Sequence, residues 1–226
     1  MRGVVVTGTD TGVGKSIVAA SVCAALSARG ETVAAFKPVV TGLDEPVGAL
    51  PHDHELLARA AGGRVAPEEV APYRYGPPVS PHYAAELAGE RIEPARLVTA
   101  ARRAAAAADV LVAEGVGGLL VPITPGYLVR DLARDLALPL LVAARTGLGT
   151  INHTLLTVEA ARAVGLSIAG IVMTPWPVEP SPLEASNRAT VERLAGVAVG
   201  GLPAADPADL STLAAAGEAL PLERWL

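Results

Sequence analysis

A glycine-rich stretch near the N-terminus has the residue types of a phosphate-binding loop. It comprises Gly8-Thr9-Asp10-Thr11-Gly12-Val13-Gly14-Lys15-Ser16, between an apolar run and an alanine-rich segment. In such loops backbone N–H groups surround phosphate oxygens, the lysine neutralises the β and γ phosphates, and the hydroxyl binds Mg²⁺. We therefore expect Gly12, Val13, Gly14 and Lys15 to hold a nucleoside triphosphate and Ser16 to ligate Mg²⁺. Five residues rather than four separate Gly8 from Gly14, so the loop is a lengthened form of the general pattern.

Two further charged residues, Lys37 and Glu114, each follow an apolar run, and Asp53 follows a glycine-containing loop. Lys37 is a candidate second cation at the triphosphate. Glu114 and Asp53 are candidate ligands, because Mg²⁺ commonly takes one or two carboxylates together with a hydroxyl and phosphate oxygens. The sequence alone leaves the alternatives open: Lys37 as a surface lysine, Glu114 as a solvent-facing glutamate and Asp53 as a helix cap.

Histidine and cysteine suggest no other chemistry. His52 and His54 flank Asp53, but no third zinc ligand stands at a recognisable spacing. Cys23 is the single cysteine, so a disulfide framework is excluded. It lies within a helical run, and we expect it to fill space in the core.

The elements that must position these residues alternate along the chain. The predicted strands are Gly3–Thr7, Val33–Lys37, Val110–Glu114, Leu119–Ile123, Pro139–Ala143, Ile168–Met173 and Val197–Leu202. The predicted helices are Lys15–Arg29, Asp53–Ala61, Pro94–Ala108, Leu128–Leu136, Thr150–Val164 and Leu183–Leu194. This rhythm predicts an α/β fold: a doubly wound, mainly parallel sheet with helices on both faces, in which ligands gather at the carboxyl ends of the strands. Two segments, Val39–His52 and Gly63–Pro81, are rich in glycine and proline and are expected to be irregular active-site loops.

Composition limits the remaining possibilities. The chain has 226 residues, of which 51% are hydrophobic and 3% aromatic, and we expect a single domain over residues 1–226. Its net charge of −5, with no basic stripe, argues against a nucleic-acid partner. There is no signal-peptide pattern and no apolar run long enough to span a membrane, so we expect a cytoplasmic protein without a membrane partner.

Four sequence blocks together resemble the dethiobiotin synthetases. They are Val6-Thr7-Gly8-Thr9-Asp10-Thr11-Gly12-Val13-Gly14-Lys15-Ser16, Phe36-Lys37-Pro38-Val39-Val40-Thr41-Gly42, Glu114-Gly115-Val116-Gly117-Gly118 and Leu148-Gly149-Thr150-Ile151-Asn152-His153-Thr154. Each block alone is weak, but their order and approximate spacing are specific and extend over the chain. The resemblance implies a P-loop nucleoside triphosphatase fold and an enzyme that joins CO₂ to 7,8-diaminononanoate and closes a cyclic urea, consuming ATP and requiring Mg²⁺.

The resemblance also implies roles for individual residues. Lys15 and Lys37 would stabilise the carbamate and the transferring phosphoryl group, and Ser16, Asp53 and Glu114 would hold Mg²⁺. Most relatives have threonine where Ser16 stands, but serine offers the same oxygen. Further contacts to the nucleotide would come from Gly115, Val116, Gly117, Thr174, Pro175, Pro203, Ala204 and Ala205. Thr174-Pro175 stands where relatives often place a base-contacting amide, so the base preference stays open.

The substrate-binding residues implied by the resemblance come from two subunits. Thr11 and Thr41 would bind the diamine or carbamate. Leu148, Gly149, Thr150 and Asn152 would reach the substrate carboxylate from the partner subunit of a homodimer, so that each active site is shared. The alternative for Thr150 and Asn152 is helix capping.

Two other functional classes fit the loop less well. Partitioning ATPases usually carry an additional lysine near the start of the loop, where this chain has Thr9 and Asp10. Amide ligases of the cobyrinate type generally carry a glutamine-hydrolysing domain, for which this chain has no room.

Overall fold

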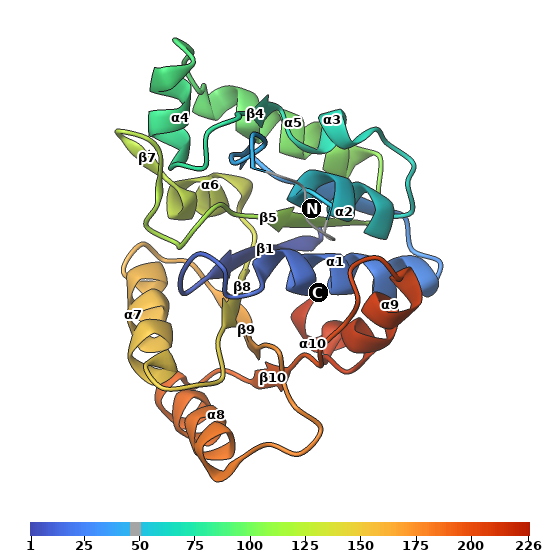
Figure 1. Cartoon of the computed structure of the whole chain (residues 1–226), viewed down its shortest axis with the longest axis vertical. Helices are drawn as coiled ribbons and strands as arrows, with labels where there is room; N and C mark the ends of the chain where they lie inside the picture. Colours follow the sequence, from blue (N-terminus) through green and yellow to red (C-terminus); the bar gives the residue numbers. More distant parts are fainter. Residues whose placement is uncertain (46–50) are drawn as a thin grey trace.

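Within the described residues, 1–45 and 51–226, the computed structural model has a central sheet of six parallel strands (Figure 1). The strand order is β10-β9-β8-β1-β5-β2. The strands are β1 (Gly3–Gly8), β2 (Val33–Phe36), β5 (Val110–Glu114), β8 (Leu140–Ala144), β9 (Ile168–Met173) and β10 (Val199–Gly201). The predicted α/β fold class is confirmed.

Helices cover both faces of this sheet. One face packs against α1 (Lys15–Ala28), α2 (Asp53–Ala60), α9 (Leu210–Glu218) and α10 (Leu222–Trp225). The other packs against α4 (Pro81–Leu87), α5 (Pro94–Ala106), α6 (Val129–Leu136), α7 (Thr150–Arg162) and α8 (Pro182–Ala195). In Figure 1, α1, α9 and α10 lie to the right of the strands and α6, α7 and α8 to the left. Side chains of β1 point alternately to the two helical layers. Val4 and Val6 pack against the first set of helices and Val5 against the second.

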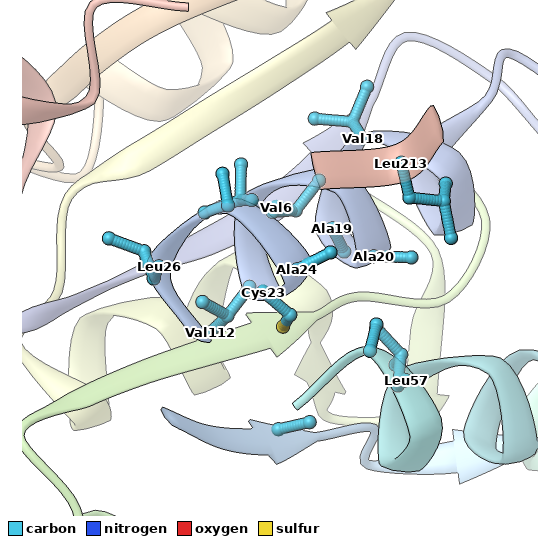
Figure 2. Packing of buried hydrophobic residues seen from close by; sticks show 14 of the residues in the cluster. Val6, Val18, Ala19, Ala20, Cys23, Ala24, Leu26, Leu57, Val112 and Leu213 are labelled. Carbon is cyan, nitrogen blue, oxygen red and sulfur yellow. The ribbon is translucent and has the colours of Figure 1, made fainter. Parts of the chain in front are cut away.

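Small residues let α1 pack closely between the sheet and two neighbouring helices. Figure 2 shows this packing for Val6, Val18, Ala19, Ala20, Cys23, Ala24, Leu26, Leu57, Val112 and Leu213. Cys23 is fully buried, which confirms its predicted place in the core, and burial raises the pKa of its thiol. A thiol in this position is a packing group rather than a nucleophile.

One predicted central strand is wrong. Residues 119 and 120 form a turn, and the chain continues as β6 (Pro122–Thr124), which pairs antiparallel with β7 (Tyr127–Leu128) outside the main sheet. Leu119 and Ile123 are nevertheless buried in the core. The apolar residues here therefore indicate that the side chains are buried, but they do not indicate a strand of the central sheet.

The two segments expected to be irregular contain short regular elements. A parallel pair joins β3 (Val39–Val40) to β4 (Tyr73–Arg74), and α3 spans Pro67–Val70. These elements are too short to show a hydrophobic period, which explains why the sequence did not indicate them. Residues 46–50 of the first predicted loop lie outside the described residues. The helices α9 and α10, beyond the last predicted strand, were also not predicted.

None of the helices in the described ranges combines the length and apolar character that a bilayer span requires.

The close contact between α1 and α9 yields a stability prediction. A Cβ at Gly217 of α9 would lie 2.2 Å from the carbonyl oxygen of Ser21 and 2.8 Å from the Cβ of Ala25. Ala has the higher helix propensity, but the backbone oxygen cannot yield without moving a helix. We expect Gly217→Ala to lower the free energy of unfolding by about 1–3 kcal/mol, the usual cost of overpacking.

Urea denaturation measures this loss. Gly126→Ala is the matched control, because a Cβ at Gly126 meets open space and no positive φ is involved. Equal stability of Gly217→Ala and Gly126→Ala would contradict close packing of the two helices.

Candidate active site

The predicted phosphate-binding loop connects the end of β1 to the start of α1, at the carboxyl edge of the sheet. Gly14 precedes the helix with φ of 93°, in the left-handed region that favours glycine. A Cβ at Gly14 would also lie 2.7 Å from Cγ2 of Thr174. Glycine is thus required here both by the backbone and by the close approach of the segment that follows β9.

Three oxygen-bearing side chains meet at the start of α1. Ser16 Oγ lies 2.7 Å from Asp53 Oδ1 and 2.9 Å from Glu114 Oε1. Asp53 is the first residue of α2, with His52 as the N-cap, and its carboxylate points to Ser16 and Lys37. The alternative of a helix cap for Asp53 is therefore wrong. Glu114 ends β5 and is 1% exposed, so the alternative of a solvent-facing glutamate is also wrong.

Lys37 donates to both carboxylates. Its Nζ lies 2.5 Å from Asp53 Oδ2 and 2.6 Å from Glu114 Oε1. The residue is 3% exposed, so it is not a surface lysine. The end of β2 places it beside β5, since the two strands pair in parallel. Sequence positions far apart are thereby brought into one cluster of two carboxylates, one ammonium and one hydroxyl.

Burial and charge oppose each other in this cluster. Burial favours the neutral form of Lys37, but Asp53 and Glu114 overcome it and raise the lysine's pKa. Burial also disfavours the ionised Asp53, yet Lys37 lowers the pKa of that carboxyl to about 2. For Glu114, which is completely buried, the desolvation is larger than the attraction to Lys37, and its pKa is raised. The ionised form of Glu114 therefore depends on neighbouring cations.

The cluster has the donor set expected of a Mg²⁺ site. A serine hydroxyl has one proton, so it cannot donate to both Asp53 and Glu114 at once. Oε2 of Glu114 is buried and has no hydrogen-bond partner among the described residues. The cluster therefore has more acceptor oxygens than hydrogen atoms to satisfy them. Mg²⁺ prefers oxygen ligands of this kind. In the described part of the chain, no three His, Cys, Asp or Glu residues group as a metal site, and His52 and His54 lie with ring centroids 6.1 Å apart.

Lys15 is held differently from Lys37. It is 7% exposed, and its Nζ donates to the carbonyl oxygen of Asp10, 2.9 Å away in the same loop. Burial is the main cause of its lowered pKa. The Lys15 ammonium therefore contacts the backbone of its own loop, and no carboxylate among the described residues is hydrogen-bonded to it.

A cavity of about 650 Å³ opens onto this cluster. Among the predicted site residues, it is lined by Thr11, Gly12, Gly14, Lys15, Ser16, Lys37, Thr41, Asp53, Glu114, Val116 and Gly117. Residues 78–81 also line the cavity, and they lie within the segment Gly63–Pro81 that was expected to be an active-site loop. Gly115 is buried and does not line the cavity, and its N–H donates to the carbonyl of Val6.

A second cavity of about 520 Å³ also adjoins the loop and shares Gly12, Gly14 and Ile17 with the larger one. The predicted residues that line it are Gly12, Val13, Gly14, Thr174, Pro175, Ala204 and Ala205. Pro203 does not line it. Arg145, Thr146 and Gly147 do, and sequence reasoning missed them. They follow β8 directly, so the rule that ligands gather at the carboxyl ends of strands would have found them.

Residues 148–152, at the start of α7, line neither cavity, although Gly147 just before them lines the smaller one. Leu148 is 89% exposed, and Gly149 and Asn152 are also exposed. Thr150 is buried and its hydroxyl donates to the carbonyl oxygen of Arg145 at 2.6 Å. Gly149, and neither Thr150 nor Asn152, is the N-cap of the helix. Within one chain, this segment does not reach the clustered side chains.

Comparisons with known proteins identify relatives of this chain. A family model described as an AAA domain matches residues 2–207. The ATP-dependent dethiobiotin synthetase BioD of Anaeromyxobacter dehalogenans (strain 2CP-1 / ATCC BAA-258) is 48% identical over 195 residues, covering 86% of this chain and 86% of that protein. The protein of the same name from Bacillus subtilis (strain 168) is 34% identical over 202 residues, covering 89% of this chain and 87% of that protein.

Solved structures share the fold at lower identity. The chain resembles a ParA family ATPase from Chlorobium tepidum TLS with a TM-score of 0.55 and 15% identity, covering 98% of this chain and 92% of that one. It resembles the cell division ATPase MinD of Pyrococcus furiosus with a TM-score of 0.54 and 17% identity, covering 100% and 99%. At these identities the likeness concerns the fold alone.

The charge coupling between Lys37 and Glu114 predicts that Glu114→Gln changes the free energy of unfolding in opposite directions with and without Lys37. In the wild-type background, Glu114→Gln should lower the free energy of unfolding by about 1.5–3 kcal/mol, the range for a hydrogen bond to a charged group. In a Lys37→Met background the same substitution should raise stability, because Glu114 is then a buried carboxylate that has lost its bound cation. Urea denaturation of the four proteins in Mg²⁺-free buffer measures both differences.

The pH dependence of stability provides a control for this comparison of four proteins. Loss of Lys37 raises the already raised pKa of Glu114 further. A carboxyl group whose folded-state pKa exceeds its unfolded value of 4.5 stabilises the fold below that pH, and this contribution is lost as the pH rises. Lys37→Met should therefore lose stability relative to Lys37→Met/Glu114→Gln as the pH rises above 4.5. An effect of Glu114→Gln with the same sign in both backgrounds would contradict the coupling.

Proposed function

The chain belongs to the family of ATP-dependent dethiobiotin synthetases, and from this premise we propose how its residues carry out the reaction. It is a ligase that uses ATP to form carbon–nitrogen bonds in biotin biosynthesis. The substrates proposed are 7,8-diaminononanoate and CO₂. The observation that carries the proposal is the meeting of Ser16, Lys37, Asp53 and Glu114 beside the phosphate-binding loop.

The proposed reaction has three steps. One amine of the diamine attacks CO₂ and loses a proton, giving a carbamate. A carbamate oxygen attacks the γ phosphorus, the bond to the β–γ bridging oxygen breaks, and ADP leaves. The second amine then attacks the carbonyl carbon of the mixed anhydride, the bond to the phosphate oxygen breaks, and a proton is lost as the cyclic urea and phosphate form. In each step the protein mainly positions reactants and neutralises charge.

The two lysines are proposed to provide that neutralisation. Lys15 lies within the loop and is desolvated, which strengthens its attraction to phosphate oxygens in the cavity. Lys37 keeps its proton firmly because two carboxylates raise its pKa, so it serves as a fixed cation for the carbamate and the transferring phosphoryl group. Thr11 and Thr41 line the same cavity and are proposed to bind the diamine or the carbamate.

Ser16, Asp53 and Glu114 are proposed to hold Mg²⁺. This ion, when bound, would supply positive charge to the phosphate oxygens. The three side chains offer the hydroxyl and carboxylate oxygens that such a site needs, and Oε2 of Glu114 is the buried acceptor without a partner among the described residues.

The smaller cavity is proposed to hold the base and ribose. It adjoins the loop and is lined by Thr174, Pro175, Ala204 and Ala205. Among the described residues its lining has no side-chain amide, so base selection would rest on backbone groups, the hydroxyls of Thr146 and Thr174, and shape.

We also propose that the active site is shared between two subunits of a homodimer. Leu148, Gly149 and Asn152 are exposed and line neither cavity of their own chain, which fits a role toward a neighbouring one. The start of α7 and the Asn152 amide would then bind the substrate carboxylate of the partner.

The function is tested by a product assay. The protein is supplied with 7,8-diaminononanoate, bicarbonate, Mg²⁺ and ATP, and mass spectrometry should detect the cyclic urea. Phosphate release should require both the diamine and CO₂, because the carbamate is the nucleophile. Rapid ATP hydrolysis without them would favour a switch ATPase of the type that shares this fold.

The shared site predicts complementation between two defective subunits. Lys15→Ala should be inactive, and Asn152→Ala should weaken diamine binding about 10- to 100-fold, the effect of one hydrogen bond to a charged group. A mixed dimer would carry both defects at one site and none at the other. At diamine concentrations well below the wild-type KM, random pairing of equal amounts should give about one quarter of wild-type activity, well above either parent.

Subunit exchange is verified with differently tagged chains, and Arg103→Ala replaces Asn152→Ala in a control mixture. If the subunits exchange and activity stays at the mean of the two parents, the shared-site proposal is wrong.

A further inference from the structure

We propose that Arg145 is a ligand of the nucleotide's phosphate chain, approaching from the smaller cavity rather than from the larger one that Lys15 and Lys37 line. The inference rests on the proposed nucleotide binding. Arg145 follows β8 and lines the smaller cavity together with Gly12, Val13 and Gly14, whereas the two lysines line the larger one.

The guanidinium lies directly beside the loop. Nη2 of Arg145 donates to the carbonyl oxygen of Thr11 at 3.3 Å. A Cβ built on Gly12 would be 3.9 Å from the same nitrogen. Gly12, Gly14 and Ile17 line both cavities, so a phosphate chain that joins the base site to Ser16 and Lys15 must pass Gly12 and Gly14. Arg145 therefore lies beside the route that the phosphates have to take.

The charge of Arg145 has no acidic partner within residues 1–45 and 51–226. This distinguishes it from Lys37, whose charge is matched by two carboxylates. A guanidinium is always protonated, and its planar set of donors matches phosphate oxygens. The long bond to one carbonyl leaves most of these donors available.

The backbone that carries Arg145 is fixed by two buried polar side chains. The Thr150 hydroxyl, 4% exposed, donates to the Arg145 carbonyl at 2.6 Å. Asn187 of α8, 5% exposed, donates through Nδ2 to the carbonyls of Thr146 at 2.9 Å and Gly147 at 3.2 Å. Burying polar side chains is costly unless they are hydrogen-bonded, and here both are bonded to this one segment. The loop is thus held in place before any ligand arrives.

The experiment measures binding rather than turnover. Inorganic tripolyphosphate with Mg²⁺ is the probe, since it has no base, and calorimetry gives its affinity for wild type, Arg145→Ala, Arg145→Gln and Arg145→Lys. Arg145→Ala should weaken binding about 10- to 100-fold, as expected for loss of a hydrogen bond to a charged group. Arg145→Lys should recover part of the loss. Arg103→Ala removes an exposed arginine from α5 and should leave the affinity unchanged.

Arg145→Gln separates a phosphate ligand from a residue that only holds the loop. Glutamine keeps a donor for the Thr11 carbonyl but has no charge, so wild-type affinity in Arg145→Gln would overturn the proposal. Equal losses in Arg145→Ala and Arg103→Ala would also overturn it, because they would indicate a general effect of net charge. If wild type binds tripolyphosphate and ATP but Arg145→Ala binds equally well, only the inference fails. If wild type binds neither, the proposed function fails with it.

Discussion

The ion pair between Lys37 and Glu114 is the constraint on which the site depends. Glu114 is fully buried at the end of β5, and an ionised carboxylate there requires a cation within hydrogen-bond distance. The parallel pairing of β2 and β5 supplies Lys37, and the first residue of α2 brings Asp53 to the same ammonium. A shift of β2 or β5 would leave a buried charge without its partner, whereas the Asp53 side chain is 42% exposed. The electrostatics of the site therefore fix the relative positions of these two strands.

The strand order explains why one loop can serve two cavities. β1 is central, with β5 on one side and β8 on the other, so the loop that follows β1 contacts the segments after both neighbours. The β5 side provides Glu114 and the larger cavity, and the β8 side provides Arg145 and the smaller one. The ParA and MinD ATPases share this fold, so the sheet alone does not set the reaction. Specificity comes from the residues that follow the strands.

Much of this arrangement could be predicted from local patterns. The loop residues and the strand ends at Lys37 and Glu114 were identified because the pattern and the role lie in the same few residues. The bonds from Asp53 to Ser16 and Lys37 were not determined, because they depend on where α2 packs in three dimensions. Leu119–Ile123 was misassigned because buried apolar residues look alike in a central strand and in a covering hairpin. The predictions for the segment at Leu148–Asn152 concern a second subunit and stay predictions.

The difference between the two lysines has a consequence for the order of events in the proposed reaction. Lys15 bonds only a loop carbonyl, so it can turn to a phosphate without leaving a carboxylate behind. Lys37 cannot, because Asp53 and Glu114 would lose their cation, and the burial of Glu114 makes that loss costly. With the ion that Ser16, Asp53 and Glu114 are proposed to hold, the two carboxylates would have another counter-charge and Lys37 would be available to the carbamate. Lys37 would thus contribute fully only with the cation in place, so the carboxylate pair would link cation binding to catalysis rather than serve only as a set of ligands.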